Sequence, residues 1–345
     1  TVYRATNDMG FDFDTAYWFY TDLLEKLPSL EDGDAVLIGQ EGPEGRLQMT
    51  YRVKEGIHWH DGEPLTAEDF QYAWEVMMDP ESGVTSRAVW EKVEGMEVRD
   101  DHTLVVTLKK GIMDPMYGPY YIPEPLPKHV LGEMSPKEIV DSEFARTGYP
   151  GTGPFVFEEW MAGDHISFTR NEDYWREGPN FEKVVFRFIP DTNARMAALI
   201  AGDCDNAGMQ VDNLPFLQQA LDRALIQYHA VAGTAWEHID MNVRPWDGRP
   251  PWFAKKEVRQ AVAYGTNRQQ MTEEILHGET EPMQSWIPAE SWAFNPNVKQ
   301  YPYEPDKARE LLASVGFEDS DGDGVVEAYG YAGTFPDGTE WSIPD

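Results

Sequence analysis

Residues 47–77 have the sequence LQMTYRVKEGIHWHDGEPLTAEDFQYAWEVM, in which a strand, a turn and a helix follow one another. Apolar and polar side chains alternate strictly over residues 47–54, as a strand with one buried face requires. After the turn, Thr66 is placed to cap a helix with Asp69 at its third position. The apolar stripe of that helix consists of Phe70, Ala73, Trp74 and Met77. The stretch therefore predicts a half-buried strand followed closely by an amphipathic helix, which ends by Asp79-Pro80.

The same two periodicities continue along the rest of the chain. A strand is expected at residues 103–108, before a proline-rich loop at 115–127, and short alternating runs over 151–189 predict a sheet. Asp191 is placed to cap a helix that ends at Gly202. A strand is then expected at 238–243, and helices at 257–264, 269–276 and 305–315. This order of elements indicates an α/β or α+β fold with a boundary between structural units near residues 233–242.

Composition excludes several classes of protein. The 345 residues include 28 Lys and Arg against 61 Asp and Glu, a net charge of −33, so the surface repels nucleic acid and anionic lipid. The aromatic fraction of 13% is too high for an acidic disordered chain. A single cysteine, Cys204, excludes an internal disulfide and a cysteine-based zinc site. No apolar run is long enough to predict a membrane span.

The cluster His58-Trp59-His60-Asp61 is a candidate metal site. His58 and His60 are two residues apart at the end of a strand, so they share a face and could chelate one ion beside Asp61. No third ligand follows at a suitable spacing. We therefore favour the alternative, in which Asp61-Gly62 forms a turn and the histidines flank it.

A second candidate metal site lies near the C-terminal end. Asp319, Asp321 and Asp323 alternate and are followed by a glycine at the sixth position, which is how a calcium-binding loop begins. The Val325 carbonyl and Glu327 would complete the ligand set, although the twelfth position, where an EF-hand has Glu, is a glycine. An acidic Asp/Gly turn without an ion explains the pattern equally well. Calcium is the one cofactor that the sequence suggests, and none is required.

The sequence has no recognisable catalytic motif. A nucleophile elbow, a phosphate loop and a His-Glu-x-x-His zinc motif are all missing. The adjacent acids Glu158 and Glu159 are expected on opposite faces of a strand, so they could not flank one glycosidic bond. The excess of aromatic residues favours binding over catalysis instead. These aromatics include Tyr17, Trp18, Tyr120, Tyr121, Trp236, Trp246, Trp252, Trp286 and Trp292.

Four ordered stretches resemble a known family, the extracellular solute-binding proteins that serve ABC importers of peptides, nickel, opines and related solutes (family 5 type). They are YRVKEGIHWHDGEPLTAED at 51–69, GTGPF at 151–155 with RNEDYW at 170–175, VFRFIPD at 185–191 with ALIAG at 198–202, and VRQA at 258–261 with Asn267-Arg268. The resemblance implies a periplasmic-binding-protein-like α/β fold with two lobes and an extra subdomain, which closes on a solute. Because family members are longer, it also implies that this chain is truncated at the C-terminus.

The resemblance further implies a domain organisation and a role. Residues 1–24 and 146–237 would form the core of lobe I, 25–145 an inserted subdomain, and 238–345 an incomplete lobe II. The protein would be a non-enzymatic, exported and lipid-anchored monomer that delivers a peptide-like or other small solute to the permease subunits of a membrane transporter. The alternative from another class is a secreted acidic glycan-active hydrolase, which only the 12 tryptophans favour. A structural surface protein without a small ligand is a third possibility.

For the ligand cleft, the sequence suggests Trp236, His238 and Asn242 at the crossover between lobes, with Tyr120 and Tyr121 in the long loop. Packing in a core explains each of these residues at least as well. The negative charge predicts that the cleft favours neutral or cationic solutes over anionic ones.

Overall fold

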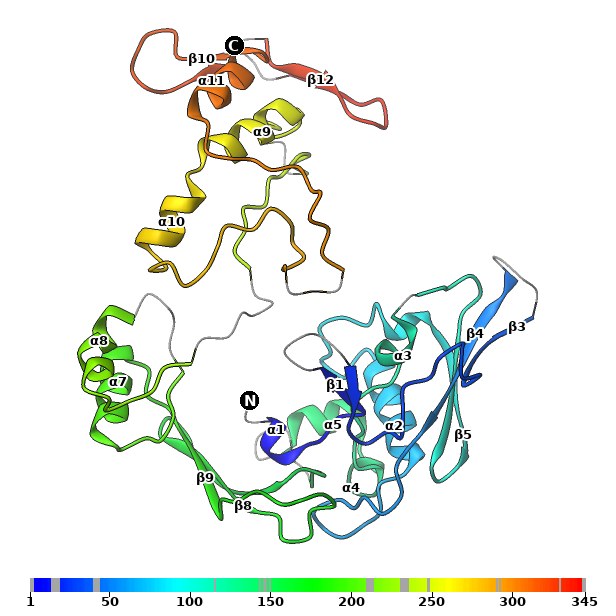
Figure 1. Cartoon of the computed structure of the whole chain (residues 1–345). Helices are drawn as coiled ribbons and strands as arrows, with labels where there is room; N and C mark the ends of the chain where they lie inside the picture. The colour runs from blue at the N-terminus through cyan, green and yellow to red at the C-terminus, as the bar shows by residue number, and fades with distance from the viewer. Residues whose placement is uncertain are drawn as a thin grey trace. The chain divides into compact units, whose positions relative to one another are not determined.

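A computed structural model (Figure 1) describes residues 3–13, 19–39, 44–114, 116–142, 144, 148, 150–208, 214–229, 236–246, 249–289, 291, 293–328 and 330–342. The chain divides into two compact units, Thr1–Pro190 and Asp191–Asp345. In the described ranges, no helix is both long and apolar enough to cross a membrane.

The first unit is built on a four-stranded antiparallel sheet. Its strands run in the order β3 (Ala35–Ile38), β4 (Arg46–Arg52), β6 (Thr103–Leu108) and β5 (Val93–Asp100). Leu47, Met49 and Tyr51 of β4 are buried and alternate with more exposed polar residues, which confirms the predicted strand. The predicted strand at 103–108 is also confirmed.

Helix α2 (Ala67–Met78) packs on β5 and β6 and closes the core of the first unit, as Figure 1 shows. The predicted cap is present as a capping box, because the Asp69 carboxylate accepts a hydrogen bond from the Thr66 backbone N–H at 2.9 Å. Phe70 joins Leu104, Val106 and other apolar side chains of the sheet in the core, and Ala73 of the same helix is fully buried. The helix ends at Met78, directly before Asp79-Pro80, as expected.

Shorter elements surround this core. Strands β1 (Phe11–Phe13) and β2 (Phe19–Thr21) pair with each other, and the short helices are α1 (Tyr3–Thr6), η2 (Trp90–Lys92), α3 (Tyr117–Tyr120), α4 (Lys128–Leu131) and α5 (Pro136–Asp141). A separate antiparallel sheet contains β7 (Phe155–Met161), β8 (His165–Arg170) and β9 (Lys183–Arg187) in that order. This sheet confirms the one predicted over residues 151–189.

The second unit is mainly helical. It contains α7 (Thr192–Ala201), α8 (Leu214–Asp222), α9 (Lys256–Gly265), α10 (Arg268–Glu274) and α11 (Pro305–Ala313). The short strands β10 (Phe317–Glu318) and β11 (Glu327–Ala328) form one hairpin, and β12 (Ala332–Thr334) and β13 (Glu340–Ser342) another. Helices α9 and α11 pack together through Ala261, Tyr264 and Ala308, and a second apolar cluster gathers around the buried Tyr331.

The predicted helices of this unit are confirmed. The Asp191 side chain accepts a hydrogen bond from the Ala194 N–H at 2.7 Å, and Gly202 ends α7 with a φ of 79°, a conformation that favours glycine. The strand predicted at residues 238–243 is wrong. A strand needs a hydrogen-bonded neighbour, and within the described residues none of the strands pairs with this segment.

The border between the two units also differs from the predicted boundary. The units separate after Pro190, whereas the sequence placed a boundary at 233–242. The predicted assignment of residues to two lobes and an inserted subdomain stays a prediction.

Candidate ligand-binding site

The His60 side chain joins the turn at residues 59–62 to the loop at 151–153. The Gly151 N–H donates to Nδ1 of His60 at 3.1 Å, and the Nε2 of the same ring lies 3.0 Å from the Gly153 carbonyl oxygen. Since Nδ1 accepts, Nε2 must carry the hydrogen. Burial lowers the pKa of His60, so the ring is held in its neutral form.

These contacts agree with the interpretation of residues 58–62 as a turn flanked by histidines, and not with the interpretation of His58, His60 and Asp61 as metal ligands. Both ring nitrogens of His60 are already hydrogen-bonded, and His58 Nδ1 lies 3.1 Å from the Gly56 carbonyl oxygen. Asp61 pairs with His129, whose Nε2 is 2.8 Å from an Asp61 carboxylate oxygen. Among the described residues, these groups form no cluster that could hold a metal ion.

The loop at 151–153 also binds the N-terminal segment. The Gly153 N–H donates to the Thr6 carbonyl at 2.9 Å, and the Asp8 N–H donates to the Thr152 hydroxyl at 3.2 Å. Both glycines lie so close to Thr6 that a Cβ on either one would overlap its backbone. The sequence Gly-Thr-Gly is therefore explained by a close approach between two chain segments.

A charged network lies beside this loop. Arg176 donates one hydrogen bond to Asp8 and another to Asp22, each at 2.8 Å, and both carboxylates are almost fully buried. Tyr174 and Trp175 donate to the two carboxylate oxygens of Asp8 at 3.1 and 2.9 Å. Burial raises the pKa of Asp8, and the hydrogen bond from Trp175 and the charge of Arg176 oppose that shift. The network holds the segments around residues 8, 22 and 174–176 together.

Sequence reasoning did not find this network. Asp8 and Arg176 are 168 residues apart, so no local pattern links them. The only signal was the RNEDYW stretch, which supplies Tyr174 and Trp175 and precedes Arg176.

The structure separates the two tyrosines that the sequence suggested as ligand contacts. Tyr120 is the last residue of α3 and is 48% exposed. Tyr121 has no exposed surface and belongs to the core of the first unit. Its hydroxyl donates to Asp114 at 2.9 Å, and burial, together with this carboxylate, raises the pKa of Tyr121. Tyr121 therefore fits the packing alternative, whereas Tyr120 is still available to a ligand.

The other three suggested residues lie together in the second unit. The rings of Trp236 and His238 have their centroids 4.1 Å apart and are inclined by 33°. The His238 Nε2 is 3.2 Å from an Asp240 carboxylate oxygen, and the Asn242 side chain accepts from the Arg244 N–H at 3.1 Å. Trp236 is 42% exposed. The segment thus presents an aromatic pair and a carboxylate to solvent.

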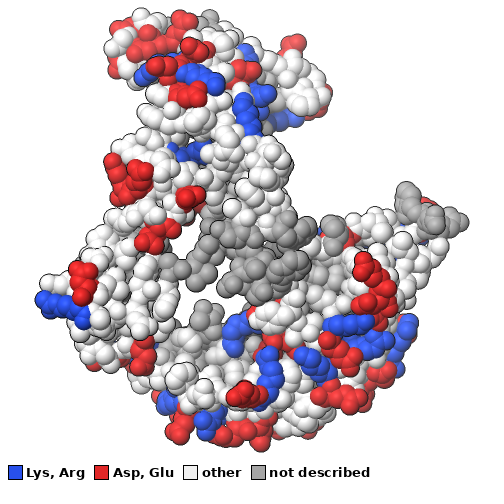
Figure 2. All heavy atoms as spheres, viewed as in Figure 1, with Lys and Arg blue, Asp and Glu red and all other residues white. Residues whose placement is uncertain are grey.

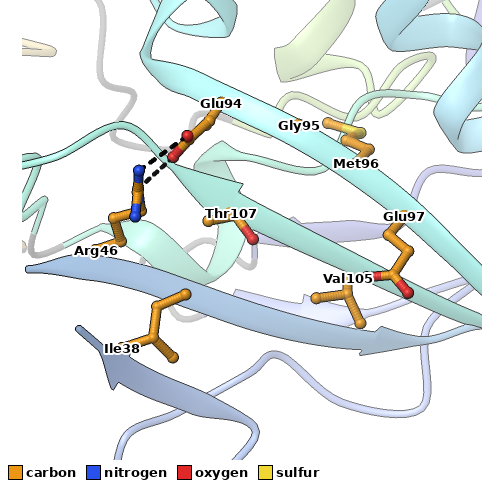
Figure 3. Close-up of a pocket in the computed structure, with 8 residues that line it drawn as sticks. All are labelled: Ile38, Arg46, Glu94, Gly95, Met96, Glu97, Val105 and Thr107. Atoms are coloured by element: carbon orange, nitrogen blue, oxygen red, sulfur yellow. Dashed lines mark hydrogen bonds and ion pairs between the residues drawn. The ribbon is translucent and has the colours of Figure 1, made fainter.

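A hollow of about 350 Å³ lies in the first unit, on the face of the four-stranded sheet that points away from the core (Figure 3). Gly95 of β5 leaves space opposite Thr107 of β6, and Figure 3 shows Arg46 of β4 pointing toward Glu94, to which it donates at 3.1 Å. None of the five suggested ligand residues lines this hollow.

The predicted calcium loop connects β10 to β11. The carboxylates of Asp319, Asp321 and Asp323 each offer an oxygen within 4.8 Å of the others. Backbone N–H groups of the loop donate to all three, and Glu327 accepts from Ser320, which lowers the pKa of Glu327. The Val325 N–H is one of these donors. This arrangement suits both an ion-binding loop and an acidic turn, and calcium binding stays a prediction.

The profile of the bacterial extracellular solute-binding proteins, family 5 Middle, matches residues 41–340 of the chain. The chain belongs to this family.

Known relatives match most of the chain. Oligopeptide-binding protein AppA of Bacillus subtilis is 28% identical over 334 residues, which are 94% of this chain and 59% of that protein. Heme-binding protein A of Haemophilus influenzae is 25% identical over 298 residues, 79% of this chain and 51% of that protein. The chain thus spans between about half and three fifths of the length of these relatives.

Solved structures show the same fold. AppA of Bacillus subtilis in complex with a nonapeptide has a TM-score of 0.68 at 24% identity, covering 98% of this chain and 62% of that one. NikZ from Campylobacter jejuni in complex with Ni(L-His) has a TM-score of 0.70 at 20% identity, covering 95% and 61%. The predicted α/β fold of the large peptide-binding proteins is therefore confirmed.

Family membership also bears on the predicted role. The family is one of binding proteins, in agreement with the prediction that the chain is not an enzyme, and its members are described as extracellular, in agreement with export. The lipid anchor, the monomeric state and the permease partner stay predictions.

The sequence analysis placed the adjacent acids Glu158 and Glu159 on opposite faces of a regular strand, and the structure shows that the strand is not regular there. A register shift between Phe157 and Glu159 interrupts β7, so Glu158 and Glu159 do not follow the strict alternation that the sequence assumed. Glu158 instead accepts from Ser167 at 2.7 Å and pairs with Lys183, and these contacts lower the pKa of Glu158. A carboxylate held ionised in this way is unsuited to act as a general acid.

Acidic and basic side chains both lie on the face of the molecule that Figure 2 shows. In the view of Figure 2, acidic and basic side chains are interleaved over the sheet of the first unit, and acidic ones gather around β10 and α11.

Tyr17, Trp18 and Trp292, which the sequence analysis also named, lie outside the described residues.

Proposed function

We propose that the protein is the solute-binding component of an ABC importer, which captures a peptide-like or other small solute and delivers it to a membrane permease. The observation that carries this proposal is the family match over residues 41–340, nearly the whole chain. Two of the four stretches that carry the resemblance also meet in space, since hydrogen bonds join the His60 turn to the loop at 151–153 and, through Asp8, this loop to Trp175.

The names of the relatives support a peptide-like solute without fixing it. Proteins described as binding oligopeptides, dipeptides, heme and a nickel–histidine complex all match this chain. A small peptide is the class that recurs most often among them. We propose that Tyr120, Trp236, His238 and Asn242 contact the solute. The family's extracellular description supports the further proposal that the protein acts at the outer face of a membrane.

The test is to look for a solute directly. Native mass spectrometry of the purified protein, followed by titration with a pool of random short peptides, should show a bound small molecule and a rise in the midpoint of thermal unfolding. A ligand that binds only the folded state at 100 times its Kd stabilises it by about 2.7 kcal/mol.

The same measurements can also overturn the proposal. If no small molecule co-purifies, and neither the peptide pool nor a metal–histidine complex nor heme changes the unfolding midpoint, the chain does not bind the solutes of its relatives. Hydrolysis of chromogenic glycosides by the purified protein would instead support the glycan-active alternative.

A further inference from the structure

We infer that residues 236–246 recognise a cationic group of the solute, an ammonium or a guanidinium, through the indole of Trp236 and the carboxylate of Asp240. This inference rests on the proposed function, because it assigns a ligand chemistry to part of the proposed site.

The indole of Trp236 is held by a neighbouring ring and is partly exposed. The imidazole of His238 stacks near one face of Trp236, with the centroids 4.1 Å apart, and yet 42% of the tryptophan is exposed. An indole is the best of the aromatic side chains for binding a cation over its face. A stacked partner fixes the orientation of the ring, so less conformational freedom is lost when a ligand binds.

A carboxylate lies next to this aromatic pair. Asp240 is 93% exposed and lies 3.2 Å from the His238 ring that stacks on Trp236. Glu237 is exposed in the same segment. Trp236 and Asp240 thus contact the same imidazole, so one short segment presents both an indole and an exposed carboxylate to a cation.

The one positively charged side chain of the segment is already paired with a carboxylate. Arg244 is the only Lys or Arg among residues 236–246, and its Nη1 lies 2.7 Å from an Asp337 carboxylate oxygen. Its guanidinium also lies over the Phe335 ring, 4.6 Å from the centroid. Hydrogen bonds from Arg244 and Thr339 lower the pKa of Asp337 to about 2, so this carboxylate is ionised at neutral pH and balances Arg244.

Together these contacts leave the segment with unbalanced negative charge beside an open indole. Among the described residues, no Lys or Arg forms an ion pair with Glu237 or Asp240, so these carboxylates disfavour an anionic ligand, whereas an ammonium or guanidinium could gain a carboxylate and a ring face. The net charge of −33 acts in the same direction at longer range. Ligands of this class include peptides with Lys or Arg side chains.

The experiment compares three peptides of equal length that differ at one central residue, Lys, Gln or Glu, by isothermal titration calorimetry. We expect the Lys peptide to bind about threefold to fivefold more tightly than the Gln peptide, with the Glu peptide weakest. Asp240→Asn and Trp236→Leu should each remove most of this preference and leave the affinity for the Gln peptide less affected. Asp337→Asn should also reduce it, because Arg244 would then be unpaired.

Asp205→Asn is the matched control, since it removes an exposed carboxylate elsewhere in the second unit and should leave the order of the three peptides unchanged. Circular dichroism of each variant checks that it is folded. If the wild-type protein binds all three peptides equally, or if Asp240→Asn leaves the preference intact, the inference is wrong although the proposed function stands. If none of the three peptides binds, the inference is wrong, and if neither a random peptide pool nor a metal–histidine complex nor heme binds either, the proposed function itself fails.

Discussion

Gly151 lies directly against the backbone of Thr6: a Cβ added to this glycine would be 1.8 Å from the Thr6 carbonyl oxygen. The same oxygen accepts a hydrogen bond from the Gly153 N–H at 2.9 Å. The N-terminal segment is thereby fixed to a loop about 145 residues later in the chain. The loop in turn binds His60, so one glycine-containing loop joins three separate parts of the first unit.

The contact predicts that Gly151→Ala is strongly destabilising. The added methyl group overlaps the Thr6 backbone, which cannot move aside as a flexible side chain could, so we expect a loss of at least about 2 kcal/mol in the free energy of unfolding. Urea denaturation measures this loss. Gly95→Ala is the control, because a Cβ there has no atom within 4 Å. Equal stability of the two variants would show that the loop and Thr6 are not in contact.

The network around Arg176 predicts a second large effect. Arg176→Met leaves the buried Asp8 without its cation and Asp22 with only Arg4, 3.9 Å away, so we expect a loss of about 2 to 3 kcal/mol in the free energy of unfolding. Urea denaturation at neutral pH measures the loss, and the double variant with Asp8→Asn should recover part of it. Arg170→Met removes only an exposed pair with Glu172 and should cost less than about 1 kcal/mol. Similar losses for the two arginines would contradict this account.

Local patterns were enough to predict the elements around residues 47–78. The side chains of β4 alternate and those of α2 repeat at helical spacing, because each element has one buried face. Strand β5 was not predicted, because its side chains do not alternate in this way. Gly95 supplies no side chain, and register shifts after Val93 and after Val98 interrupt the alternation.

The contacts that make up the site depend on residues far apart in the chain, which local patterns do not report. Tyr120 and Tyr121 are neighbours in sequence, and only the fold decides that the first is half exposed and the second fully buried. The ion pair between Arg244 and Asp337 joins residues 93 positions apart. Aromatic composition therefore indicated a binding role, but it could not indicate which aromatic side chains the fold leaves exposed.

The neutral state of His60 predicts a pH dependence of stability. The pKa of His60 is lowered in the folded protein, whereas in the unfolded chain it is about 6.5, so below that pH the unfolded state binds a proton that the folded state does not. The free energy of unfolding should therefore fall as the pH decreases from about 6.5 toward the pKa of the folded protein. His60→Gln should flatten this part of the curve and lower stability above it. The exposed His58, replaced by Gln, serves as control, and an unchanged slope in His60→Gln would refute the assignment.

The stability of the protein in calcium distinguishes the two interpretations of the loop between β10 and β11, an ion-binding loop and an acidic turn. If Asp319, Asp321 and Asp323 hold calcium, the ion binds only the folded hairpin and must stabilise it. Extracellular calcium sites often have a Kd of about 0.1 mM, so about 10 mM calcium should raise the free energy of unfolding by about 2.7 kcal/mol. Asp321→Asn should abolish most of this gain, whereas Asp205→Asn should not. Magnesium and sodium at matched ionic strength measure the separate effect of screening a charge of −33. A calcium effect that these salts reproduce, or that survives in Asp321→Asn, would identify the loop as an acidic turn held by its own hydrogen bonds.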